Sequence, residues 1–259
     1  DRDLLMASLP AGGSVTIDDV TRNLATLLVT GPKAPAILAD MTGQSMTHDD
    51  FAWLSHRKID LANCQANVIR VSFAGEAGFE IHCRMDVVVA VYDVVMAAGA
   101  AHQLRPFGML ALDSMRLEKG YRSWKADLTS DYTMFESGLG RWVNFNKDDF
   151  VGRAALQAEK QAGGQREFVT LTLDDPDDDA PFGEAVYLSN VSIDGADAGL
   201  VVSAGYGHRV GASIAMAVVD RQALAKAKDI SVLVLGRKRR ATMIEGHVLY
   251  DPENTKMKV

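Results

Sequence analysis

The sequence changes its pattern at Ala162-Gly163-Gly164, and this change constrains the fold more than any other feature. Before it, residues 1–160 hold long helical patterns of apolar residues mixed with a few strand patterns. After it, residues 161–259 hold short apolar runs separated by turn-forming residues, which is typical of a small β domain. We therefore predict two domains, one of mixed α and β structure over 1–160 and one of β structure over 161–259.

The composition excludes several classes of protein. With 47% hydrophobic and 24% charged residues among 259, the chain has the composition of a folded globular protein and enough length to bury a core. A net charge of -7 argues against a nucleic-acid partner. We find no apolar run of the roughly 18–20 residues that spans a bilayer. The sequence therefore predicts no nucleic-acid partner and no membrane partner.

The two cysteines, Cys64 and Cys83, are too few for a disulfide framework and are not spaced as zinc ligands. They fit two buried thiols in a reducing compartment, and the residues given contain no recognisable signal peptide. The six histidines are also scattered without ligand spacing. These features predict a cytoplasmic protein without a metal site.

Local patterns predict the elements of the first domain. Strands at 66–73 and 79–83 are joined by Gly75-Glu76-Ala77-Gly78, which is typical of a hairpin. Asp86 stands where an N-cap would begin an amphipathic helix. The other expected elements are a helix start over 1–6, a strand over 24–30, a helix over 34–38 and a helix over 106–119 that ends at Gly120.

The second domain is expected to hold five strands, over 168–173, 185–188, 200–203, 215–219 and 230–235. The acidic run at 174–179 lacks the glycine and glutamate spacing of a calcium loop, so we predict a solvated loop there. The only basic run, at 237–240, is expected in a hairpin turn. It could be a solvated tip or a site for an anion or a partner.

Two carboxylates of the hairpin are candidates for chemistry. Glu76 stands at the tip, which favours exposure to solvent. Glu80 lies between Phe79 and Ile81 in the second strand, where a carboxylate buried alone would be costly. A carboxylate also suits a ring that presents two adjacent N–H donors, such as a pterin or a guanine. Glu80 is therefore either a ligand contact or a side chain on the solvent face of its strand.

Three further segments mix charge with glycine or apolar residues. Asp113 and Arg116 are three residues apart on one helix and are expected to form a structural ion pair. Residues 135–143 could line a cleft for a planar ligand or form a tight strand entry, and residues 205–211 form a basic turn. No GxSxG, HExxH, P-loop or strand-to-helix GxGxxG motif occurs, so the residues alone indicate no nucleophile, metal site or nicotinamide fold.

Taken in order, these segments resemble the folate-binding aminomethyltransferase family, that is, the T-protein of the glycine cleavage system and the related C-terminal half of dimethylglycine and sarcosine dehydrogenases. The resemblance covers essentially the whole chain. The matching segments are 28–34, 70–82, 111–124, 127–129, 136–140, 149–156, 201–205 and 215–217. The residues of segments 117–124 and 249–254 resemble the dehydrogenase branch more than the free T-protein.

The resemblance implies an α+β folate-binding domain over 1–160, truncated at its N-terminus, and a small β-barrel domain over 161–259. It implies tetrahydrofolate as the cofactor and a small-molecule amine donor as the other substrate, with transfer of an aminomethyl or methylene unit between them. By position in the family motifs, Glu80 would hold the pterin ring and Phe73 would line the same site. Arg141 or its neighbour Trp142 would take the place of another family aromatic.

The chain departs from the family pattern in several places. Phe73 replaces a tyrosine and Leu112 replaces an arginine that contacts the folate tail. The family's catalytic aspartate lies upstream of Asp3, so no catalytic residue is assigned in this chain. We therefore expect a C-terminal fragment, inactive by itself, of a larger polypeptide that carries FAD only in an upstream domain. Two alternatives stay open, a folate-dependent demethylase and a non-catalytic module on the same fold.

Overall fold

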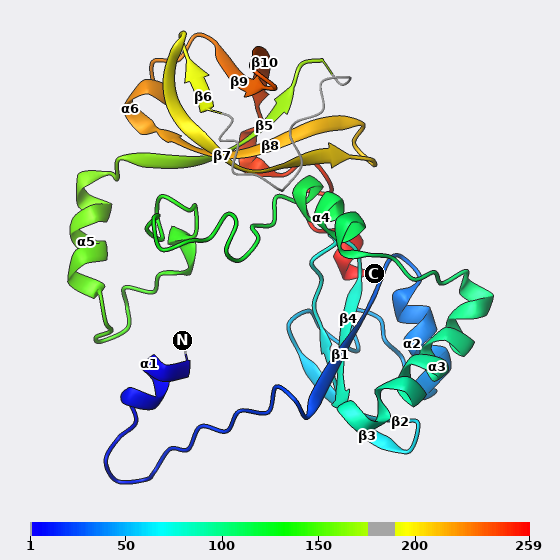
Figure 1. Ribbon diagram of the computed structural model, residues 1–259. Helices are drawn as coiled ribbons and strands as arrows, with labels where there is room; N and C mark the ends of the chain where they lie inside the picture. Colours follow the sequence, from blue (N-terminus) through cyan, green and yellow to red (C-terminus); the bar gives the residue numbers. More distant parts are fainter. Residues whose placement is uncertain (1, 176–189) are drawn as a thin grey trace. The chain divides into compact units, whose positions relative to one another are not determined.

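The computed structural model of the chain describes residues 2–175 and 190–259 (Figure 1). These residues form two compact units. Unit 1 holds the residues up to Ser72 together with Glu76–Arg105 and Lys256–Val259, and unit 2 holds Phe73–Gly75 and Pro106–Thr255. These compact units divide the chain at other positions than the two domains predicted over 1–160 and 161–259, and that domain division stays a prediction.

Unit 1 is built on a four-stranded antiparallel sheet in the order β1-β4-β3-β2. Its elements are α1 (Arg2–Ala7), β1 (Leu24–Thr30), α2 (Ala34–Thr42), β2 (His56–Leu61), β3 (Cys64–Arg70), β4 (Gly78–Arg84) and α3 (Val88–Gly99). Apolar side chains of the sheet, such as Phe79 and Ile81, form one core with residues of α2 and α3. The predicted strand over 24–30 and the predicted hairpin are confirmed.

The alternation of side chains along β4 decides which residues reach solvent. Phe79, Ile81 and Cys83 point into the core, because every second side chain of a strand faces the same side. Glu80 and His82 lie on the other, less buried face. Strand β4 therefore presents a carboxylate and an imidazole side by side on one surface of the sheet.

One helical segment of unit 1 corrects two expectations. Residues Met85–His102 form an 18-residue apolar helical stretch of mean hydropathy 1.5, which by length and composition alone could cross a membrane. In the structure it lies against the sheet, and Val91 and Val95 are buried in the core. Asp86 is not an N-cap, because it lies inside the first 3₁₀ turn and its carboxylate pairs with Arg84.

Unit 2 holds a closed six-stranded barrel in the order β10-β5-β8-β7-β6-β9. Its elements are α4 (Met109–Glu118), α5 (Arg153–Ala162), β5 (Arg166–Leu173), β6 (Asn190–Ile193), β7 (Ala196–Gly207), β8 (Ala212–Asp220), α6 (Arg221–Leu224), β9 (Ile230–Val234) and β10 (Arg237–Met243). The barrel interior is apolar, with Leu171, Ala217 and Val232 among its buried residues. Short 3₁₀ turns lie at Gly140–Trp142 and Glu245–His247 in unit 2, and at Met85–Val87, Ala100–His102 and Lys256–Lys258 in unit 1.

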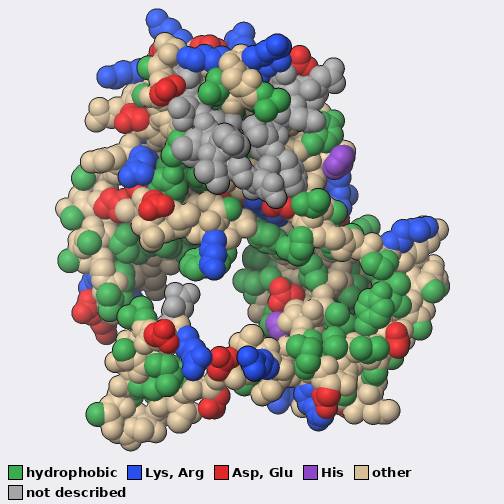
Figure 2. Space-filling model, in the orientation of Figure 1, with side chains coloured by type: hydrophobic (Ala, Val, Ile, Leu, Met, Phe, Trp, Pro, Cys, Tyr) green, Lys and Arg blue, Asp and Glu red, His purple; other side chains and the backbone are tan. Residues whose placement is uncertain are grey.

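The barrel differs from the expected five strands at its ends. The basic run 237–240 was expected in a turn but lies in β10, and the turn between β9 and β10 is Leu235-Gly236. Figure 2 shows Lys and Arg side chains gathered over the barrel end that carries β9 and β10. A strand tolerates these charges because its outer face is open to solvent. The expected strand 185–188 and residues 176–179 of the acidic run lie outside the described residues.

Candidate functional site

Glu80 is the side chain of unit 1 best placed to receive a ligand. Its Oε2 lies 3.0 Å from Nε2 of His82, and the hydroxyl of Thr26 lies 3.0 Å from Nδ1 of the same ring. Because an ionised carboxylate only accepts hydrogen bonds, Nε2 of His82 donates to Glu80. The chain Thr26–His82–Glu80 therefore fixes one oxygen of the carboxylate. No hydrogen bond from the described residues reaches the other oxygen.

The exposure of Glu80 agrees with one of the two alternatives that the sequence left open, a side chain on the solvent face of its strand. Its side chain is 38% exposed, so the carboxylate is not a buried group that requires a partner. The reverse holds for Glu76, which was expected at a solvent-exposed tip but is 5% exposed. The two side chains differ because the turn between β3 and β4 is packed against other residues, whereas the face of β4 that carries Glu80 is open.

Phe73 lies in unit 2 and stacks on another ring. The sequence placed it at the end of a strand, but β3 ends at Arg70 and Phe73 lies in the turn that follows. Its ring lies 5.8 Å from that of Tyr121, with an interplanar angle of 9°. Phe73 is 37% exposed. Tyr121 covers only part of one face of the Phe73 ring, so the ring still offers apolar surface to a planar ligand.

Arg141 and Trp142 belong to unit 2 and lie in the 3₁₀ turn Gly140–Trp142. The guanidinium of Arg141 is centred 5.2 Å from the ring of Trp142, and the indole is exposed. Burial raises the pKa of the Tyr121 hydroxyl, and the charge of Arg141 partly opposes that rise. Arg141, Tyr121 and Phe73 are therefore neighbours within unit 2, and Glu80 is described within unit 1.

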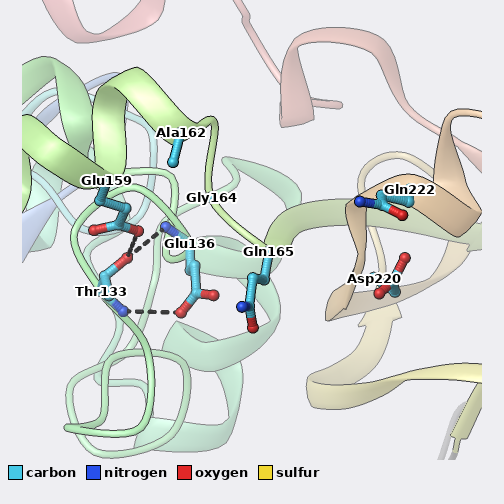
Figure 3. A pocket seen from close by; sticks show the side chains of 8 residues that line it. All are labelled: Thr133, Glu136, Glu159, Ala162, Gly164, Gln165, Asp220 and Gln222. Carbon is cyan, nitrogen blue, oxygen red and sulfur yellow. Dashed lines mark hydrogen bonds between the residues drawn. The ribbon is translucent and has the colours of Figure 1, made fainter.

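A pocket of about 640 Å³ opens elsewhere in unit 2 (Figure 3). Of the segment 135–143, which was considered as the wall of a ligand cleft, Glu136 lines this pocket. Its carboxylate accepts a hydrogen bond of 3.3 Å from the backbone N–H of Thr133 and lies 3.4 Å from Nε of Arg166. The hydroxyl of Thr133 also donates to Glu159. The carboxylates of this pocket are therefore engaged with protein donors.

Two buried charged side chains in the last turn of α4, Arg116 and Glu118, connect the helix with the barrel. Arg116 donates to Asp113, as predicted, and also to Asp127 and to the hydroxyl of Ser203. Glu118 accepts a 2.6 Å hydrogen bond from the backbone N–H of Arg209, so the basic turn 205–211 is anchored by a buried acid. These side chains hold the fold together.

Lys119 is a functional candidate that the sequence argument missed. Its side chain is buried and its ammonium lies 3.3 Å from the carboxylate of Asp251. The two residues are 132 positions apart in the chain, so no local pattern could have paired them. Among the described residues, no cluster of three or more His, Cys, Asp or Glu side chains could hold a metal ion.

Two family models match the chain. The model described as the GCVT N-terminal domain matches residues 1–147, and the model of the glycine cleavage T-protein C-terminal barrel domain matches residues 166–251. Human mitochondrial dimethylglycine dehydrogenase is 32% identical over 252 residues, which is 96% of this chain and 28% of that protein. The aminomethyltransferase of Bacillus subtilis (strain 168) is 34% identical over 175 residues, which is 67% of this chain and 48% of that protein.

A solved structure supports the same fold. The crystal structure of glycine cleavage system aminomethyltransferase T from Bartonella henselae superposes with a TM-score of 0.73 at 24% identity. The match covers 87% of this chain and 60% of that one, so the chain spans less than two thirds of each of these relatives. The expected fold class, an α+β T-protein domain followed by a β-barrel, is confirmed. The chain belongs to the glycine cleavage T-protein family.

Proposed function

We propose that this chain binds tetrahydrofolate and serves the transfer of a one-carbon unit from an amine donor to it, giving 5,10-methylene-tetrahydrofolate. We further propose that it does so as part of a flavin-dependent enzyme similar to dimethylglycine and sarcosine dehydrogenases. Membership of the T-protein family supports the folate chemistry. The likeness to human dimethylglycine dehydrogenase over nearly the whole chain supports the dehydrogenase context.

The observation that carries the proposal is the state of the Glu80 carboxylate. One oxygen is fixed by His82 and the side chain remains partly exposed, so its orientation is set before any ligand arrives. A pterin presents two adjacent N–H donors at one edge, and a carboxylate accepts such a pair with both oxygens. A preoriented acceptor loses little conformational entropy on binding, which favours affinity.

The remaining contacts are proposed from the family motifs. Phe73 would lie against the pterin ring with its exposed face, and Arg141 and Trp142 would provide a cation and an indole for the rest of the ligand. The role of these residues is to bind and orient folate, so that the amine and the one-carbon unit meet in a reactive geometry. The proposal assigns no proton-transfer residue to this chain.

Calorimetry with tetrahydrofolate tests the proposal. The Glu80→Gln variant keeps the shape of the side chain but replaces one acceptor oxygen with a donor and removes the charge. A hydrogen bond to a charged group contributes about 1.5–3 kcal/mol, so we expect Kd to rise roughly tenfold to a hundredfold.

The matched control is Glu167→Gln, which changes a half-exposed carboxylate on the barrel. It should leave Kd unchanged. Failure of the parent protein to bind tetrahydrofolate would remove the proposed function, and equal affinity of the Glu80→Gln variant and the parent would remove the assignment of Glu80. Product analysis separates the reactions, because a demethylase on this fold would yield methyl-folate rather than methylene-folate.

A further inference from the structure

The turn that carries Phe73 lies directly on the buried side chain of Lys119. Lys119 is 2% exposed. Gly75 has a positive φ of 76°, and a Cβ at this position would lie 2.9 Å from Cδ of Lys119 and 3.1 Å from Cγ. Glycine is therefore required at residue 75 both by the backbone conformation and by the close approach to the lysine. The position of the turn depends on where the lysine side chain lies.

The ammonium of Lys119 is held in one place. It donates to the backbone oxygens of Tyr250 and Asp251, the first at 3.4 Å, and it lies 3.3 Å from Oδ2 of Asp251. The Asp251 carboxylate is in turn oriented by Thr255, whose backbone N–H and hydroxyl donate to Oδ1 at 2.8 and 2.6 Å. Both charged side chains are at most 5% exposed. The geometry of this ion pair is thus specified on both sides.

Tyr121, whose ring stacks on Phe73, comes two residues after Lys119 in the sequence. Between them, Gly120 has a φ of 72° and turns the chain just after the end of α4. Tyr121 stacks on Phe73 at 5.8 Å. The turn that carries Phe73 is therefore held by Lys119 through Gly75, and the ring of Phe73 is held by Tyr121. All of these residues belong to unit 2.

We propose that the Lys119–Asp251 ion pair positions the stacked rings of Phe73 and Tyr121 for the pterin of folate. The proposal rests on the proposed function. Lys119 and Asp251 are positioning residues, because they act on the ligand through the turn and the rings. Apolar side chains of similar size can replace a buried ion pair without loss of stability, whereas the directional contacts of the charged pair specify one geometry. The role assigned to this pair is therefore geometric rather than a matter of stability.

The test separates position from stability with three variants of the protein. Lys119→Met keeps most of the side-chain volume but removes the ammonium that lies 3.3 Å from the Asp251 carboxylate. Lys119→Met/Asp251→Leu removes both charges. Leu171→Ala makes a cavity in the barrel core and serves as a control whose loss of stability is comparable to that of Lys119→Met but lies elsewhere.

Two measurements are made on each variant. Amide hydrogen exchange by mass spectrometry over residues 72–78 reports the turn without any ligand, and calorimetry with tetrahydrofolate reports binding. We expect Lys119→Met and the double variant to exchange at least tenfold faster in this segment and to bind folate at least tenfold more weakly. The double variant should recover much of the melting temperature. Leu171→Ala should change neither the exchange of the turn nor Kd.

Each result decides a separate statement. Unchanged exchange in both Lys119 variants would overturn the control of the turn by the ion pair, whatever the folate result. Faster exchange with an unchanged Kd would overturn its role in binding, as would parental affinity in the double variant. Absence of folate binding by the parent would overturn the proposed function and the folate role of the ion pair, while the exchange data would still judge its effect on the turn.

Discussion

The buried guanidinium of Arg116 offers the sharpest test of how unit 2 is stabilised. It donates to Asp113 and Asp127, both at 2.6 Å, and to the hydroxyl of Ser203 at 2.8 Å. The change to consider is Arg116→Met, which keeps the aliphatic part of the side chain and removes the cation. Met216, whose sulfur contacts the guanidinium, borders the same apolar region. We therefore expect the methionine side chain to fit this space.

The magnitude follows from what each carboxylate loses. Asp113 is partly exposed, so water can replace the arginine there. Asp127 is fully buried, and after the change its one remaining hydrogen bond in the described residues is the 2.7 Å bond from the backbone N–H of Ser123. Removing one partner of a buried ion pair costs about 3–5 kcal/mol, because the other charge remains unsolvated. That is a large part of the roughly 5–15 kcal/mol by which domains are stable.

Urea denaturation measures this loss. With a denaturant slope of about 2 kcal/mol per molar, a loss of about 4 kcal/mol lowers the midpoint by about 2 M. Trp124 and Trp142 lie in unit 2 and Trp53 lies in unit 1, so tryptophan fluorescence reports unit 2 alone when Trp53 is replaced with Phe in every variant compared. Far-ultraviolet circular dichroism reports the whole chain.

The control for Arg116→Met is Arg84→Met. It breaks an Arg–Asp pair of the same chemistry whose side chains are both more than half exposed. Water screens such an exposed pair, so the midpoint should hardly move. Equal losses in the two variants would refute the reasoning that burial, rather than pairing itself, sets the cost. So would a loss below about 1 kcal/mol for Arg116→Met.

Three further changes test local features. Burial lowers the pKa of His247 below its usual 6.5, so below about pH 6.5 the unfolded chain binds a proton that the folded chain does not, and stability falls as the pH falls. His247→Asn, which tolerates the positive φ at this position, should reduce the loss of stability between pH 7.5 and pH 5.5 in urea titrations. An equal loss of stability in the variant and the parent would contradict this reasoning. Gly120→Ala should lower the melting temperature more than Gly152→Ala, because both residues have positive φ but a Cβ would lie 2.4 Å from the backbone oxygen of His247 at residue 120 and in open space at residue 152. Leu235→Asn should raise stability by about 1 kcal/mol in thermal unfolding, since Leu235 and Gly236 both have positive φ in a two-residue hairpin turn, where Asn-Gly is preferred; no gain would mean that the exposed leucine is not strained.

The elements that the sequence predicted best are those whose signal is local. The strand over 24–30 and the hairpin strands around residues 66–70 and 79–83 have compact apolar runs bounded by turn residues, and the structure confirms them. The pair of Asp113 and Arg116 was predicted because helical spacing alone brings the two side chains together. Such features need no knowledge of the rest of the chain.

The failures concern residues whose environment is set by distant parts of the chain. Glu76 stands in a glycine-rich turn, which normally indicates exposure, but the turn is packed and the side chain is buried. The basic run 237–240 reads as a solvated tip, but closure of the barrel recruits it as β10. Asp127 follows no apolar pattern, and its burial comes from Arg116 and the loop around it. Neither periodicity nor composition carries this information.

The contact between Lys119 and Asp251 joins two segments that the sequence comparison had singled out separately. Residues 117–124 and 249–254 are the segments whose sequences resemble the dehydrogenase branch of the family. In the structure the backbone oxygen of Glu118 accepts from the N–H groups of Leu249 and Tyr250, at 3.1 and 2.9 Å, next to the ion pair. A change to either charged residue removes a nearby opposite charge from the buried side chain of the other, which is costly. The two segments are therefore one structural unit, and their residues are expected to change together in related chains rather than singly.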